Sequence, residues 1–133
     1  MKLLEDERKA LIELKLERAD ETIKEIPFLI EKEFYRNAAN RLYYACYYVV
    51  SALLLQNSYD AHSHNGINTL FALHFVKTGI VSKEDGKLYG NLYALRQTGD
   101  YDEVKTVERE DVVTLLVPAE QFIKKIEELI TNK

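Results

Sequence analysis

The chain has 133 residues, a length that suits one domain over residues 1–133. Hydrophobic residues make up 47% of the chain and charged residues 30%, and this balance excludes wholesale disorder. The single cysteine excludes an internal disulfide and a cysteine-rich zinc site. We expect a cytoplasmic protein without a membrane segment, because a lone thiol suits a reducing compartment and the longest apolar run, over 42–50, is far too short to span a bilayer.

The net charge of −4 is unevenly distributed along the chain. Residues 34–81 carry three basic side chains against one acidic side chain, a local charge of +2, whereas residues 1–33 carry seven against ten. Acidic flanks would repel a phosphate backbone, so broad non-specific binding to nucleic acid is not expected. A small cleft that holds a single phosphate remains open.

Apolar side chains at helical spacing predict helices along most of the chain. The first covers residues 3–33, where Pro27 predicts a kink or a change of packing. The second covers 34–56, and its alanines recur every seven residues, at Ala38, Ala45 and Ala52. Such a seam of small side chains lets a neighbouring helix approach closely.

A polar turn over 57–65 separates these helices from three more. The three are expected over 66–77, over 82–97 with Ser82 as the N-cap and Gly99 marking the end, and over 110–131 with Pro118 as a point of kinking or breakage. Residues 100–109 form a polar connector. No segment shows the alternation of a strand, so the sequence predicts an all-α fold, a four- to five-helix up-and-down antiparallel bundle.

The second helix carries a run of tyrosines directly after Arg41. On a helix, Tyr43 lies one turn from Tyr47 and Tyr44 lies one turn from Tyr48. One interpretation is that these rings pack in the core or at a subunit interface. The other is a stacking platform for bases, with Arg41 and Tyr44 as ligand-binding residues, because stacking on nucleic acid needs exposed rings beside cations.

A second cluster, formed by Arg96, Asp100 and Tyr101, lies at the end of the predicted fourth helix, with Arg96 in its last turn. The helix dipole favours an arginine in the last turn, and an ion pair with Asp100 would give Arg96 a purely structural role. An Arg96 that is free to contact a phosphate would instead make this cluster a binding site.

Metal and cofactor sites are not expected. His62 and His64 are separated by one residue in a loop, which is a weak metal signal, and His74 falls on an apolar face where a hydrogen-bonded core residue is typical. Cys46 lies among aromatic residues without an activating partner, which favours a packing role. The five glycines form no spaced phosphate-binding motif.

Four segments, taken in order, resemble a HEPN domain, the higher eukaryotes and prokaryotes nucleotide-binding family. They are Tyr35-x-x-Ala38-x-x-Arg41-x-Tyr43-Tyr44-Ala45, His64, Phe71-x-x-His74-Phe75-Val76-Lys77-Thr78-Gly79, and Arg96-x-x-Gly99-Asp100-Tyr101. The resemblance covers about residues 10–130 and is closest to the small stand-alone bacterial and archaeal members.

The resemblance implies a helical bundle that forms a homodimer. Many members of the family are metal-independent RNA endonucleases, often toxins paired with a minimal nucleotidyltransferase antitoxin. Their motif is an arginine followed, after four to six residues, by a histidine, and two copies of it meet at the dimer interface. Arg96 matches the arginine, but Tyr101 occupies the position of the histidine, and no histidine follows it.

This departure weighs against cleavage. An imidazole that titrates near neutrality can exchange the proton of a ribose 2′-hydroxyl, whereas a tyrosine hydroxyl, with a reference pKa of about 10, is a poor base at pH 7. The sequence therefore predicts a nucleotide- or RNA-binding domain of a toxin–antitoxin or defence-like module, in which Arg96, Asp100 and Tyr101 bind a phosphate and a hydroxyl. The alternatives are a ribonuclease with an altered motif, whose catalytic residues would be Arg96 and Tyr101, and a non-catalytic interaction module.

Overall fold

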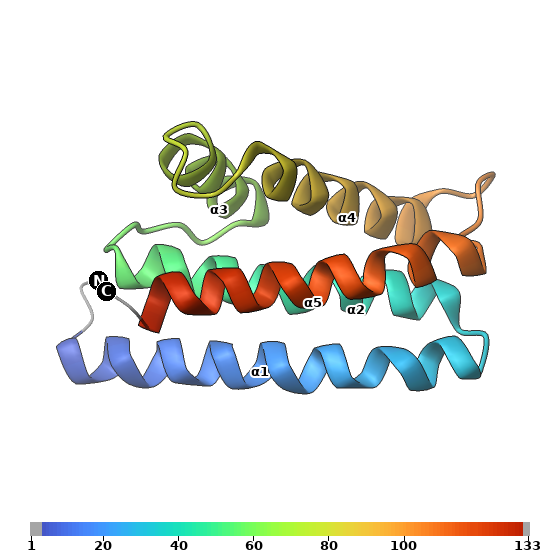
Figure 1. Cartoon of the computed structure of the whole chain (residues 1–133), viewed down its shortest axis with the longest axis horizontal. Coiled ribbons are helices and arrows are strands. Elements are labelled where there is room, and N and C mark those ends of the chain that lie inside the picture. The colour runs from blue at the N-terminus through green and yellow to red at the C-terminus, as the bar shows by residue number, and fades with distance from the viewer. Residues whose placement is uncertain (1–3, 132–133) are drawn as a thin grey trace.

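The computed structural model describes residues 4–131, which form five α-helices and one turn of π-helix (Figure 1). The elements are α1 (Glu5–Glu31), α2 (Tyr35–Gln56), α3 (His64–Phe71), the π-helical turn η1 (Ala72–Val76), α4 (Lys83–Tyr101) and α5 (Arg109–Thr131). No strand occurs within this range, and the predicted all-α bundle is confirmed. No helix within it is long and apolar enough to cross a membrane.

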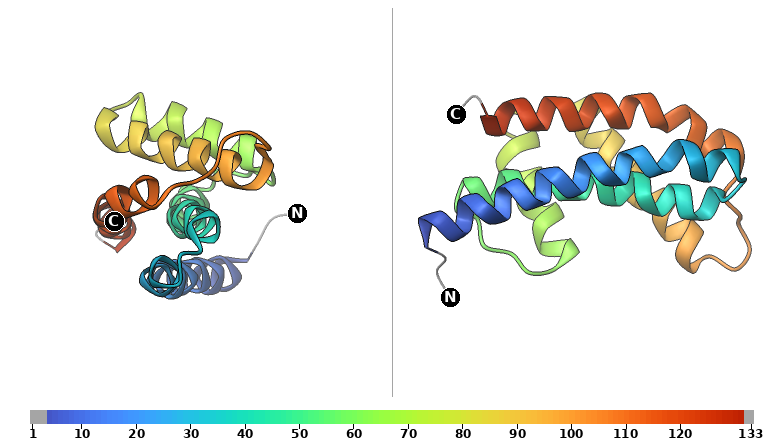
Figure 2. Two further views of the ribbon diagram at one scale, coloured as in Figure 1. Left: turned by 90° about the vertical axis from the view of Figure 1, so that its right-hand side faces the viewer. Right: turned by 90° about the horizontal axis from the view of Figure 1, so that it is seen from below.

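α2 is the central helix, and it packs against α1, α4 and α5, which surround it in the end-on view (Figure 2). Its buried side chains point in several directions and include Leu42, Tyr43 and Val49, none of which has any solvent exposure. A helix that is apolar around most of its circumference is stable only when neighbours cover its faces. The sequence of α2 therefore fixes its place at the centre of the bundle.

The alanine seam predicted on α2 faces the interior of the chain's own bundle. Ala38, Ala45 and Ala52 have no solvent exposure, and the Cys46 Sγ lies 4.0 Å from the carbonyl oxygen of Ala119 on α5. Burial raises the pKa of the Cys46 thiol, as expected for a cysteine with a packing role. The predicted close approach of a neighbouring helix is confirmed, and it takes place within the bundle.

α3 begins two residues before its predicted start. The Ser63 hydroxyl accepts a hydrogen bond from the Gly66 N–H at 2.9 Å and caps the helix, so His64 is the first helical residue. The predicted continuous helix to residue 77 ends instead in the π-helical turn η1. The predicted N-cap of α4 is confirmed, because the Ser82 hydroxyl accepts a hydrogen bond from the backbone three residues later.

α4 continues to Tyr101, beyond its predicted end near residue 97. Gly99 does not end the helix. A Cβ at this position would lie 3.1 Å from the Arg36 side chain, so the glycine serves the close approach of α2 and α4. Asp100 is therefore helical and lies on the same face as Arg96, one turn away.

Neither proline ends its helix. α1 is continuous through Pro27, and α5 is continuous through Pro118, where the sequence left a break open. A proline removes one backbone hydrogen bond, but the burial of an apolar helix face can outweigh that loss. Ala119 and Phe122, which follow Pro118 on α5, are fully buried.

Three helix ends meet at one end of the bundle. Arg8 of α1 donates from Nη1 to the carbonyl oxygen of Leu55 on α2 at 2.8 Å. Gln56 donates from Nε2 to the carbonyl oxygen of Ile130 on α5, also at 2.8 Å. The start of α2 and the end of α4 lie at the opposite end of the bundle (Figure 1).

Candidate functional site

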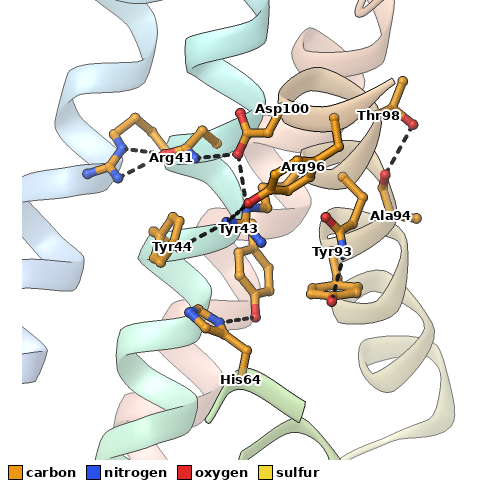
Figure 3. A network of polar contacts seen from close by, with 12 residues as sticks. Arg41, Tyr43, Tyr44, His64, Tyr93, Ala94, Arg96, Thr98 and Asp100 are labelled. Atoms are coloured by element: carbon orange, nitrogen blue, oxygen red, sulfur yellow. Dashed lines mark hydrogen bonds and ion pairs between the residues drawn. The ribbon is translucent and has the colours of Figure 1, made fainter. Parts of the chain in front are cut away.

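Arg96 is the centre of a polar cluster near the end of α4 (Figure 3). Its Nε donates a hydrogen bond to Asp100 Oδ2 at 3.0 Å. Its Nη2 donates to the hydroxyl oxygens of Tyr44 at 3.2 Å and of Tyr101 at 3.3 Å. The Arg96 side chain is 13% exposed, and its Nη1 has no hydrogen-bond acceptor within residues 4–131. One nitrogen of the guanidinium is thus unused by the protein.

The guanidinium of Arg41 on α2 is joined to that of Arg96 through one amide and one carboxylate. Arg41 donates from Nε and Nη2 to Asn40 Oδ1, at 3.1 and 2.9 Å, and Asn40 donates from Nδ2 to Asp100 Oδ2 at 3.0 Å. In the described part of the chain, Arg41 has no carboxylate within ion-pair distance. The cluster therefore holds two guanidinium groups and one carboxylate, which pairs directly with Arg96 and is connected to Arg41 only through Asn40. Its net charge is positive.

Aromatic rings lie against both cations. The guanidinium carbons of Arg41 and Arg96 lie 5.3 and 5.4 Å from the ring centre of Tyr44. Arg96 also lies 5.4 Å from the ring centre of Tyr101, which is 67% exposed. These are the distances of cation–π contacts. Tyr44 and Tyr101 could thus contact a ligand that binds to the two arginines.

The tyrosines of α2 divide between the core and the cluster. Tyr43 is fully buried, whereas Tyr44, Tyr47 and Tyr48 are half-buried. The expected neighbours along the helix are present: the ring centres of Tyr43 and Tyr47 are 5.8 Å apart, and those of Tyr44 and Tyr48 are 6.3 Å apart. The core interpretation therefore holds for Tyr43, while Tyr44 faces the arginines.

His64, which was not among the predicted site residues, contacts three of these tyrosines. The Nδ1 of His64 is 3.0 Å from the Tyr43 hydroxyl. The His64 ring stacks on Tyr47, with centres 4.2 Å apart, and its centre is 5.5 Å from that of Tyr44 in an edge-on contact. The Ser63 cap, which makes His64 the first residue of α3, is the sequence signal that could have indicated an ordered position.

The surroundings of His64 and Arg96 determine the protonation state of each side chain. Burial, followed by the positive charge of Arg96, lowers the pKa of His64, so the imidazole is neutral at pH 7. Burial disfavours the charged form of Arg96, but Tyr44, Tyr101 and Asp100 outweigh it and raise the pKa of Arg96. The site therefore combines fixed cations with a neutral imidazole.

Three hollows lie near the cluster, none of which includes Arg96, and the smallest, of about 270 Å³, borders Asn40 and Arg41. A cavity of about 360 Å³ lies between the start of α2 and the connector after α4, with Arg36 and Lys105 in its lining. An apolar groove of about 870 Å³ runs between α3–η1 and α4 and reaches Tyr93. Within residues 4–131, no three histidine, cysteine or acidic side chains gather to hold a metal ion.

The structure brings all five predicted site residues together: Arg41, Tyr44, Arg96, Asp100 and Tyr101. Their roles as ligand contacts stay predictions. The other two histidines lie outside the cluster. His62 is exposed beside Asp60, and His74 is half-buried and stacks on Tyr59 with ring centres 4.4 Å apart.

Comparison with known proteins gives consistent similarities along the whole chain. A protein of Thermotoga maritima named "UPF0332 protein" is 41% identical over 127 residues, which is 96% of each chain. Two proteins of Methanocaldococcus jannaschii, named "Putative toxin MJ0142" and "Putative toxin MJ0605", are 31% and 32% identical. The first match covers all of this chain and 90% of the relative, and the second covers 96% and 91%.

The sequence pattern of the HEPN domain matches residues 12–129. This range contains the helical bundle from within α1 to within α5 and every residue of the cluster around Arg96. The family indicated by the four sequence segments is thereby confirmed, and the chain belongs to the HEPN domain family.

Proposed function

We propose that this chain, as a single domain over residues 1–133, is a nucleotide- or RNA-binding HEPN domain in which Arg96 contacts a phosphate. The observation that carries the proposal is the arrangement of two guanidinium groups around Tyr44 with one carboxylate between them. Guanidinium groups pair strongly with phosphate oxygens, and an aromatic ring beside them offers a surface on which a base can stack. Asp100 orients Arg96 through Nε and leaves Nη1 for the ligand.

The proposal includes a role in a toxin–antitoxin module. Two relatives that match over nine-tenths or more of both chains have names containing the word toxin, which supports this role. The family resemblance adds a minimal nucleotidyltransferase as the antitoxin partner and a homodimer as the assembly. The single cysteine, which is buried, supports a location in the cytoplasm.

Binding of a fluorescently labelled oligouridylate, followed by anisotropy, tests the phosphate contact. Arg96→Ala should weaken binding by about 1–3 kcal/mol, or about five- to 150-fold, because it removes a charged hydrogen bond. Arg18→Ala is the matched control, since Arg18 is an exposed arginine on α1 and its loss changes the net charge equally. Equal affinities for the wild type and Arg96→Ala would contradict the proposal.

Thermal unfolding of the same variant separates binding from a structural role. After Arg96→Ala, Asp100 still accepts a hydrogen bond from Asn40, and its side chain is 25% exposed, so it is not left buried and unpaired. The free energy of unfolding should therefore fall by less than about 1 kcal/mol. A wild type that binds no oligonucleotide, together with a variant that melts several degrees lower, would instead support the interaction module.

A further inference from the structure

A chain of hydrogen bonds runs from the core of the bundle to His64. It begins at Tyr89 of α4, which is 4% exposed and donates from its hydroxyl to Asn68 Oδ1 at 2.6 Å. Asn68 Nδ2 in turn lies 3.1 Å from the Tyr43 hydroxyl, to which it donates. The Tyr43 hydroxyl lies 3.0 Å from His64 Nδ1, where the chain ends.

Tyr89, at the buried end of this series of hydrogen bonds, determines which group donates and which accepts in each of them. A buried hydroxyl proton without an acceptor is costly, and the short contact of Tyr89 is with the amide of Asn68. If the amide were turned, its N–H₂ would face Tyr89, and the Tyr89 proton would lose this acceptor. Asn68 therefore presents its oxygen to Tyr89 and its N–H to Tyr43. Tyr43 is also fully buried, and its oxygen accepts from Asn68, so His64 Nδ1, 3.0 Å away, is placed to accept the Tyr43 proton.

The tautomer of His64 follows from this assignment of donors and acceptors. A neutral imidazole carries one N–H, so an Nδ1 that accepts a hydrogen bond leaves the proton on Nε2. Nε2 lies on the side of the ring away from Tyr43, and it has no partner within residues 4–131 (Figure 3). Adding a second proton at Nδ1 would place two donors against each other, and burial together with Arg96 already lowers the pKa of His64.

We infer that His64 is a further ligand-binding residue of the site, a neutral imidazole that donates a hydrogen bond from Nε2 to an oxygen of the bound phosphate. Its ligand rests on the proposed function, whereas its tautomer is a property of the free protein. His64 and Arg96 both contact Tyr44, so a ligand on that ring meets both of them. Tyr43, Asn68 and Tyr89 are positioning residues, which act through His64.

In this tautomer, His64 can bind a ligand oxygen but cannot act as the base for RNA cleavage. A base that activates a ribose 2′-hydroxyl must offer a lone pair. In the tautomer fixed by Tyr43, the outward nitrogen of His64 carries a proton instead. His64 therefore adds a donor to the site without restoring the base that the motif lacks at Tyr101.

The tautomer is tested first, on the free protein at pH 7. A nitrogen-15 correlation spectrum of the imidazole rings shows which ring nitrogen carries the proton, and the His64→Gln variant identifies the His64 signals. We expect a protonated Nε2 and a bare Nδ1. Tyr43→Phe removes the hydroxyl that faces Nδ1, so a proton should then be found on Nδ1 in a fraction of the molecules. Tyr48→Phe changes a tyrosine of the same helix that does not contact His64, and it should leave the proton on Nε2. A proton on Nδ1 in the wild type would overturn the inference.

The donor is tested by binding of the labelled oligouridylate to two variants. His64→Phe keeps a ring that can stack on Tyr47 but loses the N–H, and it should weaken binding about two- to twelvefold, the effect of one hydrogen bond. His64→Gln keeps an amide N–H near the position of Nε2 and should bind nearly as the wild type does. Equally weak binding by both variants would overturn the donor role.

Arg96→Ala makes the failure of this inference distinguishable from the failure of the proposed function. If Arg96→Ala weakens binding and His64→Phe does not, the donor role of His64 is overturned and the proposed function stands. If the wild type binds no oligouridylate, or binds it no better than Arg96→Ala, the proposed function is overturned together with the ligand role of His64. The spectrum then still decides the tautomer by itself.

Discussion

At the scale of single residues, Tyr101 and His64 offer donors to a ligand where a cleaving site needs a base. The Tyr101 hydroxyl accepts a hydrogen bond from Arg96 and carries its own proton on an exposed side chain. The inferred tautomer of His64 places a proton on its outward nitrogen as well. Both groups are suited to hold oxygen atoms in place, as a binding site requires.

This arrangement predicts little or no RNA cleavage by the isolated protein near pH 7. The physical reason is that no group of the cluster offers a lone pair of suitable basicity to the ribose 2′-hydroxyl. The measurement is incubation with total RNA and with a structured transcript, without added metal, followed by gel analysis. Robust cleavage that Arg96→Ala abolishes and Arg18→Ala preserves would sink the prediction and favour the ribonuclease.

At the scale of elements, α4 shows how two glycines on one helix can serve different purposes. A Cβ at Gly86 would lie 2.8 Å from a methyl group of Val76 in η1, so this glycine allows the π-helical turn to pack closely on α4. A Cβ at Gly90 would meet nothing within 4 Å. Glycine in the interior of a helix costs up to about 1 kcal/mol relative to alanine.

Gly90→Ala should therefore stabilise the protein by about 0.5–1 kcal/mol, because it adds helix propensity without a clash. Gly86→Ala should give no gain or a loss, since the stiff side chain of Val76 cannot move aside. Thermal unfolding followed by circular dichroism measures both. As a control, Gly86→Ala should become stabilising when it is added to a Val76→Ala variant, and equal gains from both glycine variants in the wild type would refute this account.

Contacts within one helix could be predicted from the sequence, and contacts between helices could not. The pair Arg96–Asp100 follows from a spacing of four residues, and the tyrosine pairs on α2 follow in the same way. The hydrogen bonds from Tyr89 to Asn68 and from Asn68 to Tyr43 join residues 21 and 25 positions apart, on three different helices. The spacing of residues along the sequence does not predict such contacts between helices. α4 extends beyond its predicted end for a related reason, since Gly99 serves packing against Arg36 on another helix.

At the scale of the whole molecule, large apolar side chains are exposed near the end of the bundle that carries the site. They include Phe34 before α2, Tyr101 at the end of α4 and Val104 in the connector, with exposures of 55%, 67% and 90%. The alanine seam of α2 is covered by helices of the same chain and therefore offers no surface to a second copy. The surfaces that a homodimer would cover are therefore these exposed side chains and the half-buried tyrosines of α2.

We expect static light scattering at tens of micromolar to give twice the chain mass of 15.5 kDa. A two-fold interface that includes the exposed end of the bundle would bury apolar surface that one chain leaves open. Val104→Lys should shift the protein toward the monomer, and Val117→Lys, at an exposed valine on α5, should not. A monomer mass for the wild type would count decisively against the dimer.

The meeting of three helix ends at the other end of the bundle has a practical consequence for experiments on surfaces. The first turns of α1 and the last turn of α5 are held there by hydrogen bonds from Arg8 and to Ile130, whereas α4 ends with Tyr101 at the opposite end. A tether in either of these turns would hold the molecule with the cluster around Arg96 directed toward the solution. Because Cys46 is the only cysteine and is buried, a cysteine introduced there would be the one reactive thiol, and RNA or a partner protein could be captured by molecules that all share one orientation.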